Sequence, residues 1–159
     1  MIHIRKEEIV GWKERRLGEL VHRVLELNIG CGFSLSSSIE KAIIESLGEL
    51  EREEGREFLR NLFSEIDRKP DWRRFMEMLS SREKIPELDI LAPEGQRFRI
   101  DLLLVGDPSL VIDYKYAHPR EEHRWQIENY CRLLQPMFAR LEGYLLYLSE
   151  KSVRLERVV

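Results

Sequence analysis

The spacing of apolar residues changes near residue 82, from a helical period to the alternation that is typical of strands. Before that point, apolar residues recur every three or four positions and form one-sided stripes. We therefore predict four helices in the first half, over residues 12–27, from residue 39 onward, over 56–66 and over 72–79. The acid-rich run over residues 45–54 is expected to be a solvated helix face.

After residue 82 the pattern predicts short strands separated by turns rich in proline and glycine. The predicted strands cover residues 85–92, 98–105, 110–116, 143–148 and 152–158, with one helix over about 121–134. Pro86 fits only near the start of the first strand. This order predicts an α/β fold with a small mixed central sheet flanked by helices. We predict one domain over 1–159, with a helical N-terminal half, 1–82, and a sheet-bearing catalytic half, 83–159.

The composition is that of a globular protein, with 43% hydrophobic and 35% charged residues. Cys31 and Cys131 lie far apart, without the spacing of a zinc site or of a secreted disulfide scaffold. No apolar run approaches the roughly 20 residues of a membrane helix. Residues 1–10 carry charges every few positions, unlike a signal peptide. We expect a cytoplasmic protein with no membrane partner.

Three charged residues interrupt strands that are otherwise apolar: Asp101 and, one hairpin later, Asp113 and Lys115. A charge removed from water costs several kcal/mol unless it is paired or bound to a metal. Two nearby carboxylates repel each other, and a cation such as Mg²⁺ takes oxygen ligands from one or two carboxylates and from phosphate. Lys115 would then orient or deprotonate an attacking water. The alternative is an ordinary surface ion pair between Asp113 and Lys115.

Alternation also assigns side chains to faces of the sheet. Ile100, Leu102 and Leu104 are predicted to share one face of their strand, with Asp101 on the other. Three aromatic residues are expected in the core: Trp125, Tyr144 and Tyr147. His118 and His123 follow the lysine strand, where either contact with DNA or a place in a surface loop would explain them.

Four segments resemble, in order, the signature of RecB-like nucleases of the PD-(D/E)XK superfamily. That family has a G-x-x-x-H-x-x-L-E helix, an RID strand, a DYK strand and a Q-x-x-x-Y helix. The matching residues are Gly18, His22, Leu25 and Glu26, then Arg99 to Asp101, Asp113 to Lys115, and Gln126 with Tyr130. The resemblance covers roughly residues 15–30 and 85–150. Tyr116 and Ala117 stand where the family often has threonine and glycine, and two cysteines cannot supply the four ligands of the iron–sulfur cluster found in some relatives.

The resemblance implies a restriction-endonuclease-like core and a DNA nuclease that uses Mg²⁺ or Mn²⁺. It implies His22, Asp101, Asp113 and the backbone carbonyl of Tyr114 as metal ligands, Lys115 as the catalytic lysine, and Gln126 and Tyr130 as residues that orient the lysine or contact DNA phosphate. Glu26 and Glu87 are open between support of the metal and surface charge.

The resemblance also implies an exonuclease that acts on single strands or DNA ends in repair or recombination. A helicase subunit or a fused helicase domain would be its partner. The alternatives are a structure-specific endonuclease on the same fold and a non-catalytic DNA-binding scaffold domain.

Overall fold

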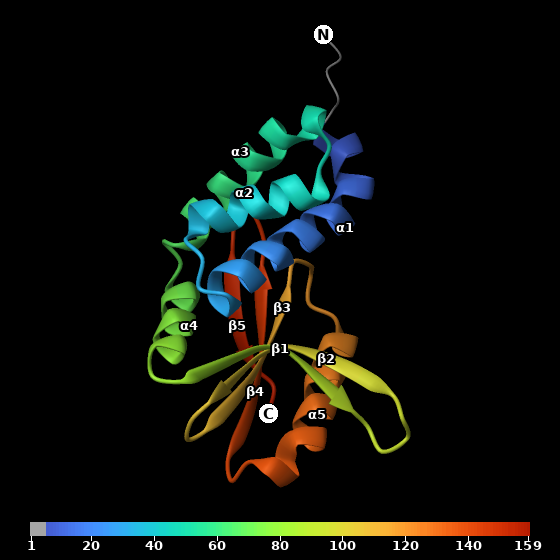
Figure 1. Cartoon of the computed structure of the whole chain (residues 1–159), viewed down its shortest axis with the longest axis vertical. Helices are drawn as coiled ribbons and strands as arrows, with labels where there is room; N and C mark the ends of the chain where they lie inside the picture. The colour runs from blue at the N-terminus through green and yellow to red at the C-terminus, as the bar shows by residue number, and fades with distance from the viewer. Residues whose placement is uncertain (1–5) are drawn as a thin grey trace.

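The computed structural model describes the backbone of residues 6–159 and the side chains of residues 15–159. Half of the charged N-terminal segment therefore lies outside the described residues. The elements, shown in Figure 1, are α1 (Lys6–Leu25), the π-helix η1 (Glu26–Gly30), α2 (Leu35–Ser46), α3 (Glu49–Ile66), α4 (Pro70–Ser80), β1 (Glu83–Leu91), β2 (Arg97–Val105), β3 (Ser109–Lys115), α5 (Glu121–Leu134), the 3-10 turn η2 (Gln135–Met137), β4 (Leu141–Leu148) and β5 (Val153–Arg157).

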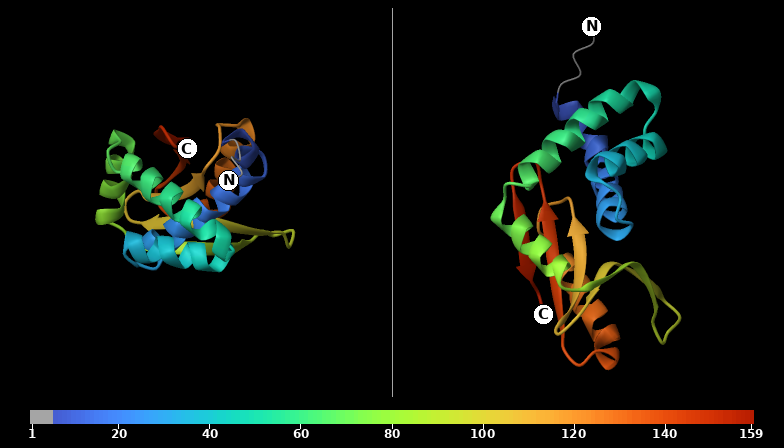
Figure 2. Two further views of the ribbon diagram at one scale, coloured as in Figure 1. Left: turned by 90° about the horizontal axis from the view of Figure 1, so that it is seen from above. Right: turned by 60° about the vertical axis from the view of Figure 1, so that its left-hand side comes forward.

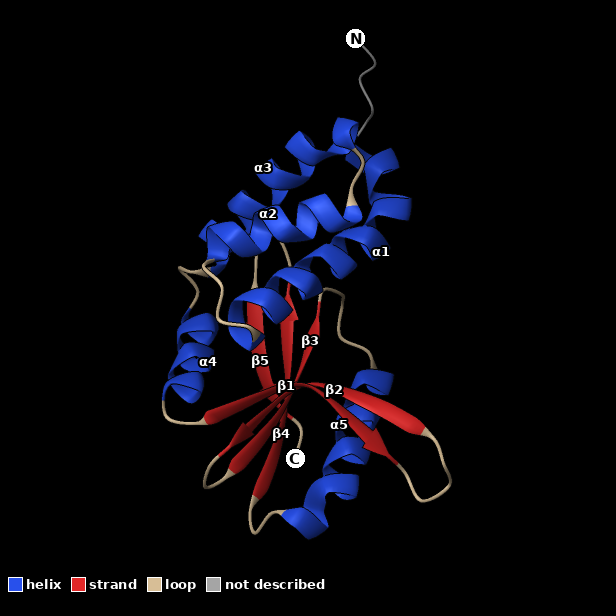
Figure 3. Ribbon diagram, viewed as in Figure 1, coloured by secondary structure: helices blue, strands red, loops and turns tan. Residues whose placement is uncertain are grey.

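The five strands form one mixed sheet in the order β1-β2-β3-β4-β5. Neighbouring strands are antiparallel except β3 and β4, which run parallel because the helix α5 connects them. Helices cover both faces: the first four helices pack on one face and α5 on the other. The predicted α/β class, with a small mixed sheet flanked by helices and a helical N-terminal segment, is confirmed. Figure 3 shows α1, α2 and α3 gathered at one end of the sheet, with α4 beside it.

Several predicted boundaries are wrong. Helix α1 begins six residues before the predicted start at residue 12, because lysine and glutamate at its start are good helix formers. Helix α3 begins at Glu49 rather than at residue 56. The acid-rich run over 45–54 therefore spans two helices, separated by an extended Leu47 and Gly48, and is not one helix face. Trp125 is 57% exposed and does not join the core, whereas Tyr144 and Tyr147 are buried as predicted.

The hairpin of β1 and β2 bends away from the rest of the sheet, as the right-hand view of Figure 2 shows. Strand β2 pairs with β3 only from Leu102 to Leu104, and its first half pairs with β1 alone. The prediction that Ile100 shares a face with Leu102 is wrong. Ile100 lies in the cluster under α5, while Leu102 and Leu104 lie in the cluster under the N-terminal helices. The bend opens the sheet between β2 and β3 at Asp101.

Pro86 is the fourth residue of β1, deeper in the strand than predicted. It is tolerated there because β1 is the edge strand and needs hydrogen bonds on one side only. No helix among residues 6–159 is both long enough and apolar enough to cross a membrane.

Candidate metal centre

Three chain segments bring polar side chains to the point where β2 leaves β3. His22 comes from the last turn of α1, and Asp101 comes from the bend in β2. Glu87 comes from β1, where its backbone adopts a left-handed conformation with φ of 52°. A glutamate in that region is strained, and such strain persists where the surrounding fold holds the residue in place.

Close contact between η1 and β1 brings Glu87 towards α1. A Cβ atom on Gly30 would lie 2.8 Å from Cβ of Pro86, the residue before Glu87. Only glycine lets the end of the first helical segment approach the edge strand so closely. The π-helix that contains Gly30 follows the turn that carries His22, and such widened turns often occur at functional sites.

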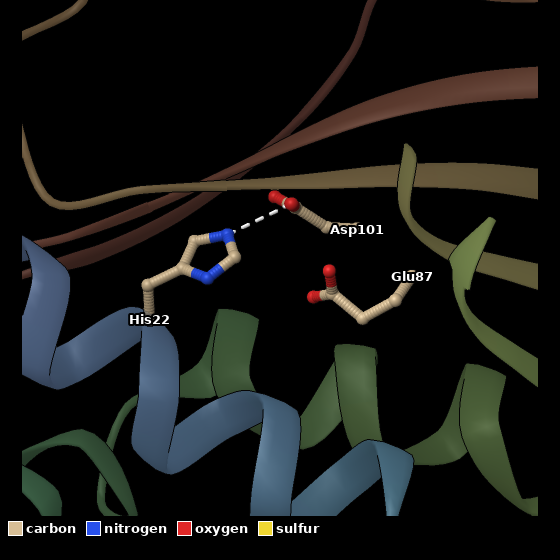
Figure 4. A group of neighbouring side chains, drawn as sticks. All are labelled: His22, Glu87 and Asp101. Carbon is tan, nitrogen blue, oxygen red and sulfur yellow. Dashed lines mark hydrogen bonds and ion pairs between the residues drawn. The ribbon is translucent and has the colours of Figure 1, made fainter. Parts of the chain in front are cut away.

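His22, Glu87 and Asp101 form a group that can hold a metal ion. One ligand atom from each lies within 4.8 Å of the others, and all three side chains are partly buried. Figure 4 shows the three side chains converging from α1, β1 and β2, with Nε2 of His22 2.8 Å from Oδ1 of Asp101. The hydrogen bond to Asp101 raises the pKa of His22, against the effect of burial. The sequence left the role of Glu87 open, and only the fold brings it to this group.

Asp101 and Asp113 form a coupled pair with opposite pKa shifts. Burial acts to raise the pKa of Asp101, but hydrogen bonds from His22 and Asp113 outweigh it, so this pKa is lowered. The backbone N–H of Tyr114 also donates to Oδ2 of Asp101, at 2.8 Å. Burial and the neighbouring charge of Asp101 raise the pKa of Asp113 to about 7. Asp101, which has more donors, holds the negative charge, and Asp113 retains the proton more strongly.

Asp113 is only 3% exposed, and its Oδ2 is a buried polar atom without a hydrogen bond. This oxygen forms an ion pair with Nζ of Lys115, at 2.8 Å. Buried polar atoms in folded proteins nearly always have a partner, so an exception calls for a functional explanation. An oxygen that keeps a free lone pair beside a second carboxylate is available to a cation.

Lys115, Gln126 and Tyr130 form a chain of hydrogen bonds between β3 and α5. Nζ of Lys115 donates to Oε1 of Gln126 at 2.9 Å, and Nε2 of Gln126 donates to the hydroxyl of Tyr130 at 2.7 Å. The two α5 residues share a face because they lie four positions apart. Burial and then the charge of Asp113 raise the pKa of Tyr130 to about 12, so its hydroxyl is neutral. These hydrogen bonds hold the ammonium of Lys115 beside Asp113.

Glu26 and Tyr114 border the centre in different ways. Glu26 forms an ion pair with Arg23 at 2.9 Å and does not belong to the group of three candidate ligands. Burial and then the charge of Glu26 raise the pKa of Glu87. The ring of Tyr114 packs edge-on against His22, with 5.7 Å between ring centroids, and so supports the imidazole. Its backbone carbonyl remains a predicted ligand.

A cavity of about 500 Å³ lies beside the centre, between α1 and the end of β3. Its lining includes His22, Lys115 and Gly18, and also Tyr116 and Ala117, which follow the lysine. A Cβ atom on Gly18 would lie 3.9 Å from Tyr116. Three of the predicted site residues, His22, Tyr114 and Lys115, therefore border a space in which a substrate group can sit next to the lysine.

Comparisons with known proteins give no family for this chain. No protein-family model matches it, and no curated protein sequence matches it. A solved structure titled "Crystal structure of SSO0001" aligns with a TM-score of 0.39 and 14% sequence identity. The alignment covers 89% of this chain and 63% of that chain. This chain therefore spans less than two thirds of the length of the SSO0001 chain. A likeness of this degree assigns neither a function nor a site.

Proposed function

We propose that this protein is a DNA nuclease of the RecB-like PD-(D/E)XK type that uses Mg²⁺ or Mn²⁺. One observation carries the proposal. Side chains from three sequence motifs meet in one connected group, which runs from His22 through Asp101 and Asp113 to Lys115, and Gln126 of the fourth motif accepts a hydrogen bond from Lys115. His22 and Lys115 lie 93 positions apart in the sequence. A chance likeness to short motifs would not predict that residues so far apart meet in one group.

The residues present fit a divalent cation. Asp113 offers a buried oxygen that lacks a hydrogen bond, beside a second carboxylate on Asp101. We propose that His22, Asp101 and Glu87, which form the group of candidate ligands, would hold the ion together with Asp113 and the carbonyl of Tyr114, which lie outside that group. A set of carboxylates with one imidazole suits Mg²⁺ and, because of the imidazole, Mn²⁺.

When bound, the ion would lower the pKa of a water molecule and neutralise charge on the reacting phosphate. The chain's own groups do the positioning. Lys115, held between Asp113 and Gln126, presents an ammonium that orients the attacking water and offsets negative charge that develops on the phosphate. Tyr130 fixes the Gln126 amide, so that its oxygen faces the lysine. Preorganised groups of this kind cost no rearrangement at the moment of reaction.

The substrate and setting follow from the resemblance to the family. We propose that the protein acts as an exonuclease on DNA ends or single strands, in the cytoplasm, in repair or recombination. A helicase subunit or a fused helicase domain would supply the strand. The cavity beside Lys115, which His22 and Tyr114 also line, leaves space for a phosphate group next to the lysine.

The test is cleavage of end-labelled single- and double-stranded DNA in Mg²⁺, Mn²⁺ or EDTA. Lys115→Ala and Asp101→Asn are compared with matched surface variants, Lys151→Ala and Asp107→Asn, whose side chains are exposed. Circular dichroism and thermal melting confirm that each variant is folded. We expect metal-dependent cutting by the wild type and both surface variants. We expect a loss of at least a hundredfold for the two site variants, since each removes a group from the reacting centre.

Equal activity of the site variants and the surface variants would refute this assignment of the site. A folded wild type that binds DNA but never cuts, and that binds no Mn²⁺, would favour the non-catalytic scaffold instead. The ladder of labelled products separates the remaining alternatives, because an exonuclease shortens the DNA from an end while an endonuclease gives internal fragments.

A further inference from the structure

A second pair of polar side chains lies next to the lysine, on the same face of the sheet. Tyr147 of β4 is the register partner of Lys115 in the parallel pairing of β3 and β4, so the two side chains stand side by side. Nδ1 of His123, in the first turn of α5, lies 3.0 Å from the hydroxyl of Tyr147, with the rings 5.6 Å apart. His123 is therefore not the surface-loop residue that its sequence position allowed.

His123 also continues the polar line of α5 that reaches the lysine. His123, Gln126 and Tyr130 are spaced three and four residues apart, so they lie along one side of the helix. Gln126 binds Lys115, and His123 binds the residue that stands beside Lys115. The metal centre, the lysine and the His123–Tyr147 pair thus follow one another across β2, β3 and β4.

The contact with Tyr147 assigns different roles to the two ring nitrogens of His123. Nδ1 faces the hydroxyl of Tyr147, at 3.0 Å, and either atom of this pair can be the donor. With the hydroxyl of Tyr147 as the donor, Nδ1 accepts and the imidazole proton lies on Nε2.

His123 stands in positive surroundings without being charged. Burial, then the charges of Lys115 and Arg120, lower its pKa, and the nearby Glu122 only partly offsets this. On the next strand, Arg154 is the register partner of Tyr147 and is 59% exposed, with one contact to Glu156. A neutral N–H donor between cationic side chains suits a phosphate oxygen, because it adds a hydrogen bond without a further buried charge.

We propose that His123, held by Tyr147, is a second phosphate-binding residue of the site. It donates from Nε2 to the DNA backbone phosphate next to the one that is cleaved. The proposal rests on the proposed nuclease function and adds to it a subsite that none of the four motifs contains. Adjacent strands stand about 4.8 Å apart, so Tyr147, which holds His123, lies one strand spacing from the lysine. The bound DNA strand is then extended and runs across β3 towards β4.

The choice of variants separates the two ring nitrogens. His123→Asn keeps a side-chain group near Nδ1, which can bond Tyr147, but it removes the outer donor. His123→Gln places its amide nearer the position of Nε2 and keeps that donor. His118→Gln is the matched control, because His118 is an exposed histidine in the loop that precedes α5. Thermal melting of each protein excludes loss of folding as the cause of any effect.

The measurement is the affinity of each protein for a labelled single-stranded oligonucleotide in Ca²⁺, followed by its cleavage rate in Mn²⁺. Each phosphate of the oligonucleotide is replaced in turn by an uncharged methylphosphonate. We expect His123→Asn to weaken binding about tenfold, the range of one charge-assisted hydrogen bond, and His123→Gln to restore most of that loss. At one phosphate beside the cleaved one, the methylphosphonate should weaken DNA binding by the wild type. The same replacement should not weaken DNA binding by His123→Asn any further.

The possible outcomes distinguish this inference from the proposed function. If the wild type cuts DNA and His123→Asn responds to every methylphosphonate as the wild type does, the phosphate subsite is refuted and the nuclease stands. If His123→Asn and His123→Gln lose affinity equally, the outer nitrogen has no role and the subsite is again refuted. A wild type that neither binds nor cuts DNA refutes the nuclease and the subsite together.

Discussion

Replacing Asp113 by asparagine should stabilise the metal-free protein while abolishing its activity. The carboxyl of Asp113 is buried beside Asp101, and these two causes raise its pKa from 3.8 to about 7. Between those two pH values the unfolded chain has released a proton that the folded protein still binds. Stability therefore falls as the pH rises through this interval, and the full cost is present above pH 7. An asparagine never ionises and avoids that cost.

The magnitude follows from the pKa shift. A shift from 3.8 to about 7 corresponds to at most about 4 kcal/mol, at 1.36 kcal/mol per pKa unit. The lowered pKa of Asp101 returns part of this energy, because the hydrogen bond between the two carboxyls raises the pKa of Asp113 and lowers that of Asp101. The amide can also donate to Asp101, so that this carboxylate keeps a partner. We expect a net gain of about 1–3 kcal/mol at pH 8, or about 3–9 °C in Tm.

The assay is urea unfolding and thermal melting in EDTA at pH 5, 7 and 8. Asp107→Asn, at a residue whose side chain is 77% exposed, serves as the matched control. The gain of Asp113→Asn over the wild type should be largest at pH 8 and should shrink towards pH 5, while the control stays within about 0.5 kcal/mol of the wild type. Adding Mn²⁺ should reverse the order, since only the wild type would gain stability from the ion. A variant that is less stable than the wild type at pH 8, or a gain that does not change with pH, would refute the reasoning.

Two further predictions concern the metal and the core. His22→Ala should weaken Mn²⁺ binding at least tenfold in a calorimetric titration at pH 8, since it removes the only imidazole of the candidate group. The control variant His118→Ala, at an exposed histidine, should bind Mn²⁺ as the wild type does. Equal affinities of the two variants would exclude His22 as a ligand. Gly143→Ala should lower the free energy of unfolding by about 1–3 kcal/mol in urea, because its Cβ would lie 2.5 Å from Cγ2 of Ile127 in a packed core. Gly48→Ala, at the N-cap of α3 and with no atom within 4 Å of the new Cβ, should cost less than about 1 kcal/mol. A similar cost at both glycines would contradict this account of the packing.

Local patterns were sufficient for the second half of the chain and less so for the first. The helix over 121–134 and the five strands were predicted with errors of a few residues at most, because alternation and turn residues act over short distances. The start of α3 was missed, since its first turns are rich in charge and lack an apolar stripe. The exposure of Trp125 was also missed, because composition cannot say which side of a helix faces the sheet.

The sequence by itself determined the fold class and the identity of the candidate residues. Periodicity sets the order of helices and strands, and the resemblance to the RecB-like motifs singles out His22, Asp101, Asp113 and Lys115. Only the tertiary structure decided how these residues meet. The bend of β2 at Asp101 moves Ile100 to the opposite face, and the left-handed backbone of Glu87 places that side chain beside His22. Both features arise from contacts between segments far apart in the chain, such as Gly30 against Pro86, and no local pattern encodes such contacts.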